Sequence, residues 1–216
     1  MRFFLLSLFG IDAALQLYAC FPPEKQRLRR VTKLLLMPLL MLCYLLYARR
    51  FQSTALLAML CCLLGDLFLL FRTKTRLFGA GLAAFAMGHA LYIFTFFNLM
   101  PAIPRAATLV PLCLICTLAA ALFARYLRGG ELPDSFVAPG LMYGFLVCLT
   151  AGSAFVYARG GAHAGYLAAL GGCLFVASDA VLAVDRFRRP LPYRSVIVMS
   201  TYIIAQTMLF ASLALA

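Results

Sequence analysis

Two aspartates, Asp66 and Asp179, each lie inside a long apolar run that is followed by basic residues. The first run is CCLLGDLFLLFRTKTR at residues 61–76, and the second is FVASDAVLAVDRFRR at residues 175–189. A charged side chain at the centre of a membrane helix costs about 2.5–3.5 kcal/mol on insertion scales, so such residues usually serve a function. Two buried carboxyl groups can share acid catalysis, one protonated and one ionised. We therefore predict that these two aspartates are catalytic.

The composition is that of an integral membrane protein. The chain has 216 residues, of which 65% are hydrophobic and 12% are charged, and its mean hydropathy is +0.97. Soluble domains contain about 45–50% apolar and about 25% charged residues. The net charge of +12 could suggest nucleic-acid binding, but Lys and Arg cluster in short loops between apolar runs. This distribution reflects membrane topology and attracts anionic headgroups, so we expect membrane lipids and no nucleic acid as partners.

We expect an all-α fold with eight transmembrane helices in one bundle, forming a single domain over residues 1–216. Each apolar segment is close to the ~20 residues that cross a ~30 Å hydrocarbon core. The first segment could also be a signal peptide, but Asp12 and Tyr18 inside it argue against that interpretation. The predicted spans are 3–21, 31–48, 54–71, 77–100, 106–127, 137–157, 164–184 and 195–215.

The basic residues predict an orientation for these eight spans. The first, third, fifth and seventh loops and their flanks hold fourteen Lys and Arg residues, including Arg72 and Lys74, whereas the other side holds five. The positive-inside rule therefore places the odd loops in the cytoplasm and both termini outside it. We expect a multi-pass protein of the cell inner membrane with this topology.

The polar residues inside the spans lie mostly on the side of the odd loops. At 1.5 Å per residue, Asp66 and Asp179 are each about 9 Å from their basic loops. We therefore predict a polar pocket that opens toward these loops, with the two aspartates at its centre. Helical spacing and depth add supporting residues to the candidate site, namely Asp12, Lys33, His89, Tyr92, Tyr143, Ser178, Tyr202 and Gln206.

The third and seventh spans have a related pattern, which suggests an internal repeat. Gly65-Asp66 in one corresponds to Ser178-Asp179 in the other, and each pair is followed by an apolar turn and a basic loop. Eight spans divide into two sets of four, and an even number of helices in each half would produce a parallel repeat about an axis normal to the membrane. We expect this 4 + 4 arrangement.

Four groups of residues together resemble the YhhN-type lysoplasmalogenase family over nearly the whole chain. The resemblance implies a polytopic enzyme that hydrolyses the vinyl ether bond of a lysophospholipid substrate, releasing a fatty aldehyde and glycerophospho-ethanolamine or -choline. The resemblance leads us to expect Lys-Pro near the start of the second span. Here Lys33 is followed by Leu34, and the proline comes later, at Pro38, so the role of Lys33 stays open. The four groups are Gly65-Asp66-xx-Leu69, Phe85-xxx-His89-xx-Tyr92, Ser178-Asp179-Ala180 with Arg186-Phe187, and Tyr202-xxx-Gln206.

Vinyl ether hydrolysis suits two carboxyl groups, because it passes through an oxocarbenium ion similar to that of glycosidases. Either Asp66 or Asp179 could be the acid. Tyr143, Tyr202 and His89 could hold the two aspartates by hydrogen bonds, although His89 is equally well explained as an interhelical hydrogen-bonding residue and the tyrosines as packing groups. The basic loops could hold the substrate phosphate. Asp12 could instead be a structural partner of Lys33 or of a tyrosine.

Other functional classes remain open at this stage. A proton-coupled transporter would also use paired intramembrane carboxylates, but no pair of Gly/Pro-broken spans occurs at corresponding positions. A zinc hydrolase would need more than His89, because His163 is predicted in an outer loop. A structural or receptor role would leave two buried acids unexplained. The eight cysteines all lie in or beside apolar segments, so we predict no cofactor and no metal. The sequence carries no signal of oligomeric state.

Overall fold

The computed structural model describes residues 2–21, 25–71, 75–102 and 104–216, and within these ranges the chain forms eight helices and no strand. The eight predicted spans are confirmed as helices. The helices are α1 (Arg2–Ala19), α2 (Gln26–Tyr47), α3 (Ser53–Leu69), α4 (Thr75–Leu99), α5 (Ala106–Arg128), α6 (Asp134–Arg159), α7 (Gly165–Phe187) and α8 (Arg194–Leu215).

Length and composition make this a multi-pass membrane protein. Six of the described helices, α2 and α4–α8, are long and apolar enough to cross a membrane, whereas the apolar helices Phe3–Ala19 and Ser53–Leu69 are shorter. The α2 helix begins five residues before its predicted span because Arg27, Arg29 and Arg30 continue the helix beyond its apolar part. Hydropathy detects only the part of a helix that lies in hydrocarbon, so basic ends of this kind are missed.

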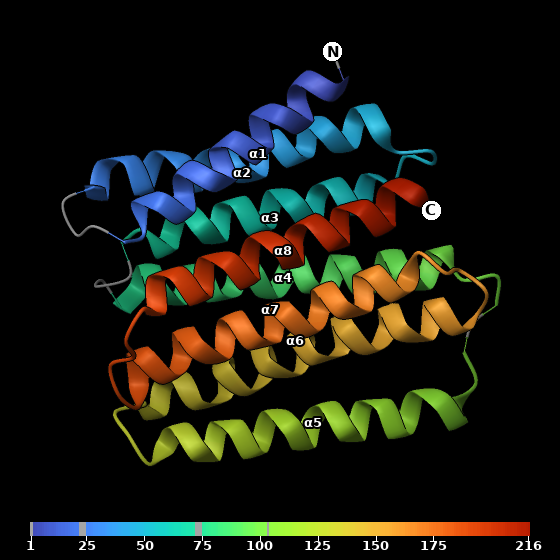
Figure 1. Cartoon of the computed structure of the whole chain (residues 1–216). Coiled ribbons are helices and arrows are strands. Elements are labelled where there is room, and N and C mark those ends of the chain that lie inside the picture. Colours follow the sequence, from blue (N-terminus) through green and yellow to red (C-terminus); the bar gives the residue numbers. More distant parts are fainter. Residues whose placement is uncertain (1, 22–24, 72–74, 103) are drawn as a thin grey trace.

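The helices run antiparallel, and their neighbours follow a pattern that repeats in the two halves of the chain. The contacts α1 with α2, α2 with α3 and α3 with α4 recur as α5 with α6, α6 with α7 and α7 with α8. The contact of α4 with α6 likewise corresponds to that of α8 with α2. In Figure 1, α4 and α8 occupy the centre, and α1 and α5 lie at opposite edges. These contacts support the predicted 4 + 4 parallel repeat.

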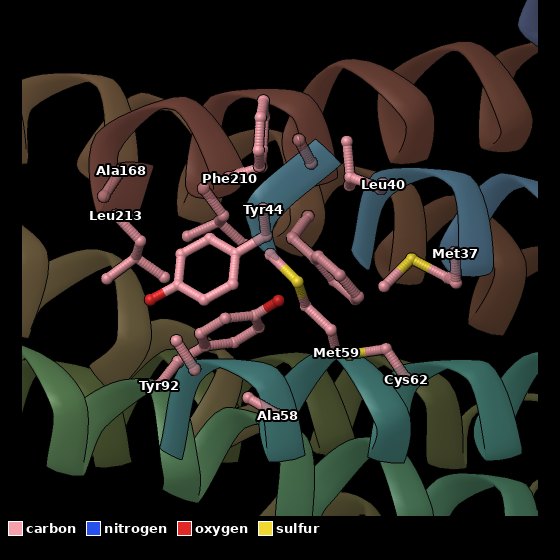
Figure 2. Packing of buried hydrophobic residues seen from close by; sticks show 14 of the residues in the cluster. Met37, Leu40, Tyr44, Ala58, Met59, Cys62, Tyr92, Ala168, Phe210 and Leu213 are labelled. Carbon is pink, nitrogen blue, oxygen red and sulfur yellow. The ribbon is translucent and has the colours of Figure 1, made fainter. Parts of the chain in front are cut away.

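The two ends of the bundle differ in polarity. The C-terminal ends of α1, α3, α5 and α7 lie at one end, left in Figure 1, and the start of α1 and the end of α8 lie toward the other. Figure 2 shows the buried apolar cluster, in which Tyr44, Met59, Tyr92 and Leu213 pack between α2, α3, α4 and α8. All four side chains are completely buried. The polar cavity described below lies in the half of the bundle nearer the odd loops. Three residues of these loops, Arg72, Lys74 and Pro22, lie outside the described residues.

Close helix packing positions the helices that carry the aspartates. A Cβ atom on Gly65 of α3 would meet the Phe85 ring of α4 at 2.5 Å, so only glycine permits this approach. A Cβ on Gly171 of α7 would lie 2.8 Å from the backbone oxygen of Ala205 on α8. Small residues at such contacts let membrane helices pack by van der Waals attraction. They place Asp66 beside α4 and keep α7, which carries Asp179, close to α8.

Candidate active site

Asp66 and Asp179 line one cavity, as the sequence predicted. This polar cavity has a volume of about 330 Å³ and lies among α1, α2, α3, α4, α7 and α8 at the end of the bundle that carries the odd loops. Of the predicted supporting residues, Lys33, Ser178 and Tyr202 also line it. Residues more than a hundred positions apart in the sequence therefore reach a common space, as expected for a binding or catalytic site.

Asp66 is almost completely buried and is held by two helices. Its side chain is 2% exposed, and the Nζ atom of Lys33 on α2 lies 3.0 Å from its Oδ1 atom. The hydroxyl group of Tyr202 on α8 donates a hydrogen bond of 2.5 Å to Oδ2. A cation and a hydrogen-bond donor both stabilise the ionised form of a carboxyl group. Lys33, whose role the sequence left open, forms an ion pair with Asp66.

Asp179 lies in a different electrostatic environment. The hydroxyl group of Tyr143 on α6 donates a hydrogen bond to its Oδ2 atom. Among the described residues, none forms an ion pair with Asp179, although it is only partly exposed. A carboxyl group that is removed from water without a cation favours its neutral form. The two aspartates therefore have distinct surroundings within one cavity.

The partners of Asp66 and Asp179 come from equivalent helices of the repeat. Lys33 reaches Asp66 from α2 to α3, and Tyr143 reaches Asp179 from α6 to α7, the equivalent pair of helices in the second half. The first half thus supplies a cation and the second a neutral hydroxyl group. Equivalent helices of the two halves therefore give the two carboxyl groups different partners.

Arginine side chains from three helices surround the outer part of the polar cavity. Arg29 and Arg30 on α2, Arg186 on α7 and Arg194 on α8 all line it. The Nε atom of Arg194 lies 3.1 Å from a carboxylate oxygen of Asp185, which orients its guanidinium group. Arginine binds phosphate well because its planar fork can donate two parallel hydrogen bonds. The cavity therefore combines a basic outer part with two acids deeper inside.

His89, Tyr92 and Gln206 line neither this cavity nor its apolar neighbour described below. The completely buried His89 ring has its Nδ1 atom 3.0 Å from the Thr150 hydroxyl group, which joins α4 to α6. The Tyr92 hydroxyl group donates a 3.2 Å hydrogen bond to the side-chain oxygen of Gln206, which joins α4 to α8. These contacts favour the interpretation of His89 as an interhelical hydrogen-bonding residue.

Two further predicted residues have mainly structural contacts. The Ser178 hydroxyl group donates a 3.1 Å hydrogen bond to the backbone oxygen of Val198 and so joins α7 to α8. Asp12 on α1 is 6% exposed, lines neither cavity, and has an Oδ2 atom without a hydrogen-bond partner among the described residues. Lys33, one of the two structural partners considered for Asp12, forms its ion pair with Asp66 instead.

Sequence reasoning missed Gln16 and Thr32 at the edge of the polar cavity. Gln16 lines the cavity and accepts a hydrogen bond from the Thr32 hydroxyl group, which joins α1 to α2. A signal was present, because Gln16 lies one helical turn after Asp12 on an otherwise apolar helix. Among the described residues, no group of three or more His, Cys, Asp or Glu side chains could hold a metal ion.

An apolar cavity of about 260 Å³ adjoins the polar one and was also not predicted. It lies among α4, α5, α6 and α7, and both Asp179 and Tyr143 line it. The two cavities share five lining residues, namely Leu69, Phe78, Phe85, Asp179 and Leu182, of which Asp179 alone is ionisable. Asp179 is therefore placed where a polar and an apolar space meet.

The chain is similar in sequence to known proteins. The chain is 33% identical over 155 residues to human "Lysoplasmalogenase TMEM86B", covering 72% of this chain and 61% of the human protein. It is 33% identical over 166 residues to the pig protein of the same name, covering 77% and 64% respectively. The chain thus spans less than two thirds of the length of these relatives, and no solved structure matches it. The sequence model of the YhhN family matches residues 28–213, so the chain belongs to the YhhN family.

Proposed function

We propose that this protein is a membrane lysoplasmalogenase, which hydrolyses the vinyl ether bond of a 1-alkenyl lysophospholipid to a fatty aldehyde and a glycerophospho-ethanolamine or -choline. The observation that carries the proposal is the polar cavity, in which two buried carboxyl groups lie behind a group of arginines. The names of the human and pig relatives support the same activity. The substrate phosphate would bind Arg29, Arg30, Arg186 and Arg194.

The surroundings of the two aspartates assign their roles in this proposal. Asp66 is the ionised group, because Lys33 neutralises it at 3.0 Å and Tyr202 donates to its other oxygen. Asp179 is the proton donor, because its described contact is the neutral Tyr143 hydroxyl group. Unequal environments for two carboxyl groups are the usual way in which an enzyme separates an acid from a base.

The reaction begins when Asp179 transfers its proton to the second carbon of the alkenyl chain. The first carbon and the ether oxygen then form an oxocarbenium ion, which the negative charge of Asp66 stabilises. Water attacks the first carbon and gives its proton to Asp66. In the hemiacetal that results, Asp66 returns this proton to the leaving glycerol oxygen while Asp179 takes the hydroxyl proton. The carbon–oxygen bond breaks, the aldehyde forms, and both aspartates regain their starting states.

The test is aldehyde release from a lysoplasmalogen by purified protein, with a chelator added in parallel. Asp66→Asn and Asp179→Asn should each abolish turnover while the protein stays folded and inserted. Asp12→Asn is the matched control, because Asp12 is also a buried membrane aspartate but lines neither cavity. Near-normal activity in either of the first two variants would contradict the two-carboxyl mechanism.

Isotope labelling tests the order of bond formation independently of mutation. In D₂O, protonation at carbon places one deuterium on the second carbon of the aldehyde product. In water enriched in ¹⁸O, attack at the first carbon places the heavy oxygen in the aldehyde rather than in the glycerol product. An aldehyde without deuterium at the second carbon would exclude proton transfer to carbon and with it the proposed role of Asp179.

A further inference from the structure

Small side chains on α5, α6 and α7 form part of the wall of the apolar cavity, among larger apolar residues. Ala120 and Ala124 on α5, Gly140 and Gly144 on α6, and Ala183 on α7 all line it. A Cβ atom on Gly140 would meet no other atom within 4 Å, so open space borders this position directly. Protein interiors are normally packed without voids larger than a water molecule. A space of this size beside a partly buried acid therefore indicates a ligand site.

The two cavities share part of their lining, and the shared part includes the acid Asp179. Asp179 and Phe85 line both of them, whereas Tyr143 lines only the apolar cavity and Tyr202 only the polar one. The arginines lie only around the polar cavity. If the phosphate of an amphiphile binds among the arginines, its reacting bond would therefore lie beside Asp179, and its chain would extend into the apolar cavity.

The α5 helix forms the outer wall of the apolar cavity. Figure 1 shows α5 at the edge of the bundle, beyond α6. One side of α5 faces the cavity through Ala120 and Ala124, and Leu114, Ile115 and Leu118 on its other side are 60–65% exposed. Large exposed apolar side chains on a membrane helix contact lipid tails. The cavity is thus separated from the bilayer by a single lightly packed helix.

The length of the cavity suits a hydrocarbon chain. On α6 the lining residues extend from Phe136 to Cys148, which corresponds to about 18 Å of helix. The hydrocarbon core of a bilayer is about 30 Å thick, so a chain that spans one leaflet is about 15 Å long. A single extended chain of this length therefore matches the cavity.

We propose that the apolar cavity binds the alkenyl chain of the substrate and makes hydrolysis depend on chain length. This inference rests on the proposed lysoplasmalogenase function. Gly140→Leu fills the cavity near the odd loops, and Cys148→Phe fills its deeper end. Gly10→Leu is the matched control, because Gly10 lies in α1, lines neither cavity, and also has open space around its Cβ position.

The first experiment measures kcat/KM for lysoplasmalogens with alkenyl chains of increasing length. At least one cavity variant should lower the long-chain to short-chain ratio tenfold or more, while Gly10→Leu keeps the ratio of the unaltered protein. Because Gly140 has free space around it, its variant should fold even if Cys148→Phe does not. An unchanged chain-length profile in the folded cavity variants would overturn the proposal.

The second experiment detects the chain without requiring hydrolysis. A lysophospholipid with a saturated ether chain and a photoreactive diazirine near its end is cross-linked to the protein, and the labelled peptides are mapped by mass spectrometry. Labels on the cavity faces of α5 and α6 that lysoplasmalogen competes away would support the chain site even if no aldehyde were formed, in which case only the proposed function would fail. Labels elsewhere, or competition equally by diacyl phospholipid, would overturn it.

Discussion

Replacing Lys33 with methionine removes the cation beside Asp66 while keeping a long apolar side chain on α2. The Nζ atom lies 3.0 Å from Oδ1 of Asp66, and the two side chains are 18% and 2% exposed. At this separation, with an effective dielectric constant of about 20, the attraction is about 5–6 kcal/mol before desolvation is counted. Desolvation and the partial exposure of Lys33 offset about half of this, so we expect Lys33→Met to lower the free energy of unfolding by roughly 2–3 kcal/mol.

The two partners should be coupled in a double-mutant cycle. Asp66→Asn alone should cost less, about 1 kcal/mol, because the Lys33 ammonium group can still reach water in the cavity. In Lys33→Met/Asp66→Asn neither charge remains buried without a partner, so the double variant should be more stable than Lys33→Met. The expected coupling is about 2 kcal/mol, within the range for contacting charged pairs. All three variants should be catalytically inactive, because each removes either Asp66 itself or the cation that stabilises its ionised form.

Thermal unfolding in detergent measures this cycle. The cysteines are free, and Cys43, Cys62 and Cys116 are buried, so a thiol-reactive fluorescent dye reports their exposure on unfolding. For a chain of this size, 2–3 kcal/mol corresponds to a fall in Tm of about 5–10 °C. Strictly additive Tm shifts, with Lys33→Met fully active, would refute the assignment of Asp66 as the ionised group.

Three further predictions concern the supporting residues and the topology. His89→Gln should keep activity within about tenfold, or ~1.4 kcal/mol of barrier, because His89 lines neither cavity; a larger loss in kcat of the folded protein would give it a catalytic role. Tyr143→Phe should lower kcat about tenfold with little change in KM, because it removes the hydrogen bond to Asp179, and a change confined to KM would contradict this. A reporter fused after Ala216 should be active only outside the cytoplasm, as the bias of fourteen basic residues to five predicts.

The number of helices and the two central acids could be predicted from the sequence. Apolar runs of about twenty residues must form helices in a bilayer, because every backbone polar group has to be satisfied within its own segment. Asp66 and Asp179 stand out because charge is rare in such runs. The repeat could also be inferred, since Gly65-Asp66 and Ser178-Asp179 occupy corresponding spans. These features follow from local composition and depth, which the sequence expresses directly.

The partners of the two acids depended on the tertiary structure. Helical spacing places His89 and Tyr92 on the same face as Phe85, but it does not specify which neighbour that face meets. Contacts such as Gly65 against Phe85 set the rotation and separation of the helices. As a result, Phe85 lines both cavities, while His89 lies against Thr150 and away from them.

The apolar cavity also appears only when the helices are packed. Alanines or glycines occur in every described helix except α2, and at glycines such as Gly65 and Gly152 a neighbouring side chain fills the space beside them. Between α5 and α6 the facing residues Ala120, Ala124 and Gly140 leave that space open beside Asp179. A cavity is volume that no side chain occupies, so its position is determined by all the surrounding helices together and by no single segment of the sequence.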